Sequence, residues 1–189
     1  ALRRQLAEMD ASPPDEQRRL VTVLFADLAG FTTLSERMDP EDVRELQHAF
    51  FAAMTRPIEA YEGCVEKYIG DAVLAVFGVP QAHEDDPERA VRAALALQEA
   101  MAALNERLSR VPSRAGLPGS VSLFSLPLPS LSLRVGVHTG LVISRVEEEG
   151  GFVVTGDTVN LAARLQGAAE PGTVLISRDT YRLVAHAFV

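Results

Sequence analysis

The strongest constraint on the fold of this chain is an apolar run that ends in a carboxylate. Residues 21–26 read Val-Thr-Val-Leu-Phe-Ala, and Asp27 follows them directly. An apolar run of this length predicts a buried strand. A carboxylate at the end of a buried strand is costly unless another group pairs with it. The fold must therefore bring a partner to Asp27.

The first half of the chain predicts two helices and a hairpin after this strand. Asp39-Pro40 opens a helix at residues 40–61, because an aspartate before a proline is a common helix start. The strands 64–69 and 72–77 form a hairpin around the turn Gly70-Asp71. A second, longer helix begins near His83 and extends to about Leu108, and it is rich in Ala, Leu, Glu and Arg.

The second half of the chain adds short elements. We expect two strands, 131–137 and 140–147, joined through a turn at 138–140. The remaining elements expected are an extended segment at 151–154, a helix at 158–166, a strand at 173–176 and a last helix that starts at 177–179. This order predicts an α/β fold, a ferredoxin-like βαββαβ sandwich with strand and helix additions at its C-terminal end.

The 189 residues predict one domain with an appendage. Residues 1–19 form an N-terminal appendage and linker, because Pro13 and Pro14 stop the first short helix. The domain then covers 20–189, and its segment 109–130, rich in Ser, Pro, Gly and Leu, is a loop or insertion. The chain begins on alanine, so we expect further domains in a longer protein.

The composition indicates which kinds of binding partner and which cellular location to expect. The formal net charge is −8 and no basic block occurs, so nucleic acid is not an expected partner, although a local phosphate site is compatible with this charge. Cys64, the single cysteine, reads as a buried thiol. No apolar stretch approaches the ~18 residues that span a bilayer. Without an apolar leader either, the sequence predicts a cytoplasmic protein with no membrane segment.

Asp71 is the expected neighbour of Asp27. In the split βαββαβ order the first strand lies beside the hairpin, so its end and the hairpin turn meet at one edge of the sheet. Two carboxylates at contact distance need a shared proton or a cation. Oxygen ligands without a Cys/His cluster favour Mg²⁺ or Mn²⁺ over zinc. The alternative is that both aspartates are ordinary turn residues.

The residues after Asp27 suit a phosphate. Gly30 lets the backbone turn closely after the strand, and Phe31 follows it. The next residues, Thr32-Thr33, supply free N–H groups at a possible helix start, where an anion can bind.

Four separated motifs carry a family resemblance. FADLAGFTTLSE, VEKYIGDAVLAVFG, RVGVHTG and TGDTVNLAARL occur in this order. Together they resemble the class III adenylyl and guanylyl cyclase catalytic domain, and the helix HEDDPERAVRAAL resembles its soluble-cyclase-like bacterial branch. The resemblance covers about residues 20–188.

The resemblance implies an adenylyl cyclase that uses two metal ions, Mg²⁺ or Mn²⁺. Asp27 and Asp71 would hold the ions with the backbone carbonyl of Leu28. The ribose 3′ oxygen of ATP would attack the α-phosphorus, forming 3′,5′-cyclic AMP and releasing pyrophosphate. Asn160 matches the asparagine that orients the ribose, and Arg164 matches the arginine that stabilises charge on the transferred phosphoryl group. Asn160 and Arg164 are four residues apart, so one helix face would carry both.

The resemblance also implies the base and the assembly. Lys67 matches the lysine that reads adenine, which favours ATP over GTP. In the family the metal aspartates come from one subunit, and the lysine, asparagine and arginine come from the other. Since this chain carries both sets, we expect a head-to-tail homodimer.

Two features keep other functions open. Val153 occupies the second base-reading position, where the family has Asp or Thr, and an isopropyl group cannot hydrogen-bond a base. The family's triphosphate-binding lysine falls beyond residue 189. Two alternatives therefore remain. One is a guanylyl or relaxed-specificity cyclase, and the other is a degenerate domain that binds nucleotide and regulates a partner.

Overall fold

The computed structural model describes residues 16–110, 129–146 and 151–188. Most of the predicted appendage and the centre of the predicted 109–130 insertion lie outside these residues. The elements in chain order are β1 (Gln17–Leu28), α2 (Phe31–Ser35), α3 (Pro40–Ala60), β2 (Cys64–Ile69), β3 (Ala72–Phe77), α4 (Asp86–Ser109), β4 (Leu133–Val146), β5 (Phe152–Thr155), α5 (Asp157–Ala168), β6 (Thr173–Ile176) and α6 (Arg178–Val184).

The sheet has the predicted split order. Its strands run β2-β3-β1-β4-β5, and β6 pairs with β4 in parallel. Strand β1 is antiparallel to both β3 and β4, so it lies between the hairpin and the fourth strand. The order β1-α3-β2-β3-α4-β4 is the βαββαβ unit, and β5, α5, β6 and α6 are the C-terminal additions. The predicted ferredoxin-like α/β class is confirmed.

The prediction of two strands at 131–137 and 140–147 is wrong. One continuous strand, β4, runs through the supposed turn, because β1 pairs with it from Leu28 opposite Leu133 to Gln17 opposite Ser144. Strand β1 itself begins at Gln17, four residues before the apolar run 21–26. Gly140 serves close packing here, since a Cβ atom at this position would lie 2.6 Å from Thr158 Oγ1.

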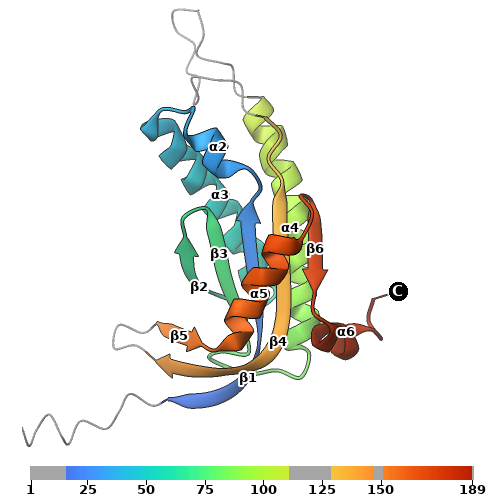
Figure 1. Cartoon of the computed structure of the whole chain (residues 1–189). Helices are drawn as coiled ribbons and strands as arrows, with labels where there is room; N and C mark the ends of the chain where they lie inside the picture. Colours follow the sequence, from blue (N-terminus) through green and yellow to red (C-terminus); the bar gives the residue numbers. More distant parts are fainter. Residues whose placement is uncertain (1–15, 111–128, 147–150, 189) are drawn as a thin grey trace, which may run out of the picture.

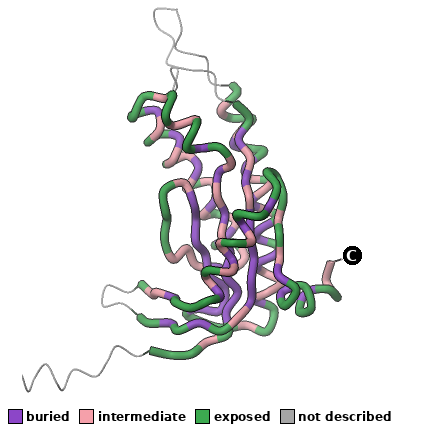
Figure 2. Tube along the Cα trace, in the orientation of Figure 1, coloured by how far each residue is buried: buried purple, intermediate pink, exposed green. Residues whose placement is uncertain are grey.

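Helices α3 and α4 cover one face of the sheet (Figure 1). Helix α3 begins at Pro40, as predicted, and turns a row of fully buried side chains at four-residue spacing towards the sheet: Leu46, Phe50, Met54 and Ile58. Strand β3 is buried along its whole length, because it lies in the middle of the sheet with side chains packed on both faces. Figure 2 shows the buried trace concentrated in these central strands.

Helix α5 lies on the opposite face of the sheet from α3 and α4, over β4 and β1 (Figure 1). A smaller core forms beneath it, in which Ala162 of α5 packs with Val142 of β4 and Leu74 of β3. Tyr68 and Ile69, at the end of β2, are exposed. The edge of the hairpin therefore presents apolar side chains to the outside, and the Tyr68 hydroxyl also bonds Thr55 Oγ1 of α3 at 2.7 Å.

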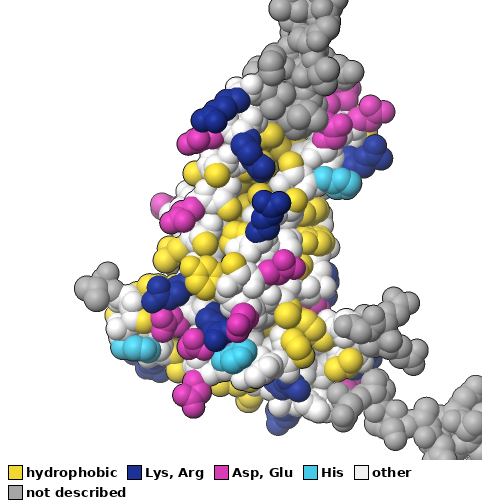
Figure 3. All heavy atoms as spheres, turned by 180° about the vertical axis from the view of Figure 1, so that it is seen from behind, with side chains coloured by type: hydrophobic (Ala, Val, Ile, Leu, Met, Phe, Trp, Pro, Cys, Tyr) yellow, Lys and Arg dark blue, Asp and Glu magenta, His cyan; other side chains and the backbone are white. Residues whose placement is uncertain are grey.

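The outer surface of the helical layer is chemically mixed. In the view from behind, basic side chains lie singly among acidic and apolar ones (Figure 3). Within the described residues, no helix combines the length and the apolar character needed to cross a membrane.

Candidate active site

Asp27 and Asp71 lie together at one edge of the sheet. Asp27 is paired in register with Ala72, the first residue of β3, and Asp71 directly precedes that residue in the turn. Gly70 takes a positive φ of 63° there, which allows the tight turn. The end of β1 and the hairpin turn lie side by side at the upper edge of the sheet in Figure 1.

The pKa of Asp71 is raised, because its carboxyl group is partly buried and lies close to that of Asp27. Burial, the negative charge of Asp27 and a hydrogen bond between the two side chains, in that order of size, together raise the pKa of Asp71 to about 6. The pair therefore holds a proton up to a pH of about 6. A divalent cation would replace that proton and satisfy both carboxylates, so the donor set fits Mg²⁺ or Mn²⁺.

Asp27 has two further partners that sequence reasoning missed. Arg134 of β4, which lies opposite Asp27 in register, donates from Nη2 to Oδ2 of Asp27 at 3.0 Å. Gln166 of α5 donates from Nε2 to the same oxygen at 3.1 Å. Arg134 Nε is buried and has no hydrogen-bond partner. The RVGVHTG motif contains Arg134, but only the strand register places it beside the carboxylates.

The segment after β1 turns back over this edge. Gly30, with φ of 76°, is the N-cap of the short helix α2, and its carbonyl accepts from Leu34 N at 3.1 Å. The side chains of Leu28 and Phe31 are buried in the core. A ligand at this edge can thus meet both residues only through their backbones, whereas Thr32 is exposed.

The other predicted site residues lie on β2 and α5. Lys67 lies on β2 with its side chain 49% exposed, and its Nζ contacts Glu66 Oε1 at 3.1 Å. Asn160 and Arg164 lie on the exposed side of α5, whereas Ala162 and Gln166 are buried. Across the described residues, neither Lys67 nor the two α5 residues form a hydrogen bond or ion pair with the carboxylate pair. The predicted site residues thus fall into two sets, the carboxylate pair on one side and Lys67, Asn160 and Arg164 on the other, and we call these sets the two half-sites.

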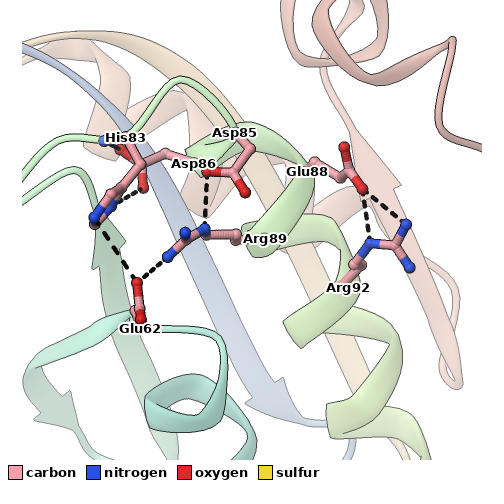
Figure 4. Close-up of polar contacts among 7 residues, drawn as sticks. All are labelled: Glu62, His83, Asp85, Asp86, Glu88, Arg89 and Arg92. Atoms are coloured by element: carbon pink, nitrogen blue, oxygen red, sulfur yellow. Dashed lines mark hydrogen bonds and ion pairs between the residues drawn. The ribbon is translucent and has the colours of Figure 1, made fainter.

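Two pockets of about 270 Å³ belong to the helical layer and include none of the predicted site residues. One is lined by alanines and leucines of α3 and α4, with Arg56 and Arg107. The other lies where the end of α3 meets the start of α4, and ion pairs fill its surroundings (Figure 4). There Arg89 donates to Asp85 at 2.9 Å and also pairs with Glu62. These contacts tie two helices together, so we assign this network to packing.

Among the described residues, no group of three or more His, Cys, Asp or Glu side chains is placed to hold a metal. A metal at the carboxylate edge would therefore have only Asp27 and Asp71 as side-chain ligands of these types. Further ligands would have to come from the backbone or from the substrate. This is compatible with Mg²⁺, which usually binds one or two carboxylates together with phosphate oxygens.

A family model described as the adenylate and guanylate cyclase catalytic domain matches residues 14–188. The chain belongs to the class III nucleotidyl cyclases. Adenylate cyclase 1 of Rhizobium meliloti is 34% identical to this cyclase domain over 153 residues. The match covers 79% of the chain but only 21% of that relative, so the chain spans about a fifth of its length.

Solved structures agree with this assignment for both base specificities. The adenylyl cyclase CyaB from P. aeruginosa has a TM-score of 0.76 and 31% identity, covering 92% of this chain and 84% of that one. The guanylyl cyclase Cya2 has a TM-score of 0.75 and 29% identity, covering 88% of this chain and 79% of that one. The cyclase fold is thus shared, and the base must be argued from individual residues.

Proposed function

We propose that this cyclase domain converts ATP to 3′,5′-cyclic AMP and pyrophosphate at sites formed between two copies of the chain. The juxtaposition of Asp27 and Asp71 carries the proposal, because the raised pKa of Asp71 marks a pair that needs a cation or a proton. Lys67, exposed on β2, favours adenine as in the family.

The carboxylates would hold two divalent ions, with the Leu28 carbonyl as a further ligand. When bound, such ions acidify the ribose 3′-hydroxyl and neutralise charge on the triphosphate. Arg134 already lies against Asp27, and its side chain is 30% exposed, so the outer guanidinium donors could also meet a phosphate oxygen. The backbone turn at Gly30 and Thr32 lies beside the same edge.

The second half-site would complete the reaction from the partner subunit. Asn160 would orient the ribose so that its 3′ oxygen lies in line with the α-phosphorus. Arg164 would stabilise the charge that develops as the new bond to the 3′ oxygen forms and the bond to pyrophosphate breaks. Both side chains are exposed on α5 and, in the part of the chain that the structure describes, have no protein partner, so they are free to contact a substrate.

A relaxed purine cyclase is the second candidate, because Val153 lies in β5 where a polar base-reading group would be expected. Base selectivity then rests on Lys67 alone. This candidate and the first predict the same carboxylate chemistry. They differ only in whether GTP is converted.

The test is cyclic nucleotide production from ATP and from GTP with Mn²⁺, on the wild type and on Asp71→Asn. We expect cyclic AMP from the wild type and a loss of about 100-fold or more in the variant, since a ligand of a catalytic ion is removed. Asp85→Asn is the matched control, because Asp85 lies in the α4 ion-pair network. Comparable production of cyclic GMP would favour the relaxed cyclase. Binding of nucleotide without any product would favour a regulatory domain and contradict the proposal.

A further inference from the structure

Glu66 is a buried acid directly beside the base-reading lysine. Its side chain is 1% exposed, whereas the neighbouring Lys67 side chain is 49% exposed. Charged side chains are rarely buried this completely unless they are paired. The Lys67 ammonium, at 3.1 Å from Oε1, is the only charged partner of Glu66 within the described residues.

A β-bulge turns Glu66 inwards. Strand β2 pairs Val65 with Ala75 and Lys67 with Leu74, so Glu66 is the extra residue that has no partner on β3. A bulge redirects a side chain and occurs often beside functional sites. The bulge thus brings two successive side chains of β2, an acid and a lysine, into contact with each other.

Glu66 also links the two outermost strands of the order β2-β3-β1-β4-β5. Strands β2 and β5 are its terminal members, yet Val154 N of β5 donates to Glu66 Oε1 at 3.4 Å. Val154 follows Val153, the second base-reading position of the family pattern. One carboxylate oxygen therefore contacts both the lysine that reads the base and the strand that carries the other base-reading position.

The second oxygen of this carboxylate is unsatisfied. Glu66 Oε2 is buried and has no hydrogen-bond partner. Burying a carboxylate with one unbonded oxygen lowers the stability of the fold. A glutamine or an apolar residue at this position would lower it less. A role for the negative charge itself would account for its presence here.

We propose that Glu66 is a positioning residue that fixes the Lys67 ammonium and thereby sets the preference for adenine, an inference that rests on the proposed cyclase function. An ammonium group only donates hydrogen bonds, so by itself it can donate equally well to adenine N1 and to guanine O6. These two acceptors lie at different places on the base edge. The location of the ammonium therefore decides which base is read, and Val153 cannot help.

Holding Lys67 in one place limits its freedom. A lysine side chain has four rotatable bonds, and ordering it at the moment of substrate binding lowers affinity. The ion pair with Glu66 orders it beforehand and still leaves two N–H donors for the base. Loss of the charge at Glu66 should thus weaken ATP binding more than it slows the chemical step.

The experiment measures kcat and KM for ATP and GTP in four proteins: wild type, Glu66→Gln, Lys67→Ala and the double variant. Glutamine keeps the shape of the side chain and an oxygen for Val154 N, so the variant retains the link to β5. We expect Glu66→Gln to lower the ATP-to-GTP ratio of kcat/KM by about tenfold, mainly through the KM for ATP, as for loss of one charged hydrogen bond. Glu88→Gln, whose partner Arg92 lies on α4, is the matched control.

Three results bear on the inference in different ways. If Glu66 acts through Lys67, the Glu66→Gln change has no further effect on the ratio in the Lys67→Ala background. An equal effect in both backgrounds, or a wild-type ratio retained within about twofold in Glu66→Gln, overturns the positioning role but leaves the cyclase assignment intact. A wild type that makes neither cyclic nucleotide overturns the proposed function and this inference together.

Discussion

At the scale of the residue, the proton on Asp71 makes the stability of the metal-free domain depend on pH. Its pKa is about 6 in the folded chain, above the usual value of 3.8. Between these values the folded state keeps a proton that the unfolded state has lost, so the free energy of unfolding falls as the pH rises from about 4 to about 7. Urea unfolding across this range, without divalent ions, measures the slope.

Asp71→Asn separates this effect from the other carboxyl groups. Asparagine cannot titrate, and it keeps the size of the side chain beside Asp27. We expect the difference in unfolding free energy between the two proteins to move in favour of the variant as the pH rises through about 6. A difference that stays constant across the range would show that Asp71 carries no shifted proton.

At the scale of the element, helix α5 depends on a glycine in β4. A Cβ atom on Gly136 would collide with backbone atoms of Ala162 and Gln166, which cannot move aside by rotating a side chain. Gly136→Ala should therefore push α5 off the sheet and lower the unfolding free energy by about 1–3 kcal/mol. The shift would also move Gln166 from Asp27, so kcat should fall as well.

Gly167→Ala is the control for that prediction. Gly167 lies in α5 and a Cβ atom there would meet nothing within 4 Å. Alanine at this site should leave activity unchanged and raise the unfolding free energy by up to about 1 kcal/mol, since alanine favours a helix over glycine. Denaturant unfolding of both variants compares them directly. If Gly136→Ala is as stable as the wild type, the close approach of α5 is not required.

Glycines in β4 also show which features of the fold could not be predicted from the sequence. The apolar run before Asp27, the hairpin around Asp71 and the periodicity of α3 are local signals, and the elements that they predict are present. Gly140 instead suggested a turn, because a glycine that admits a neighbouring side chain looks the same as one that bends the chain. The contact of Arg134 with Asp27 depends on the register of β4 against β1, which local sequence does not contain.

At the scale of the whole molecule, the separation of the two half-sites on one chain predicts complementation between inactive variants. Asp71→Asn damages the carboxylate half-site, and Arg164→Ala damages the α5 half-site. In a mixed head-to-tail dimer, one site receives both damaged halves and the other receives both intact halves.

Random exchange of subunits makes about half of the dimers mixed, each with one working site of two, so an equimolar mixture should reach about a quarter of wild-type activity. Each variant alone should be inactive at the same total concentration, and activity of the mixture should rise with the time allowed for exchange. A mixture that remains as inactive as its components would mean that both half-sites act within one chain or that the subunits do not associate, and sedimentation of the wild type would separate these two explanations.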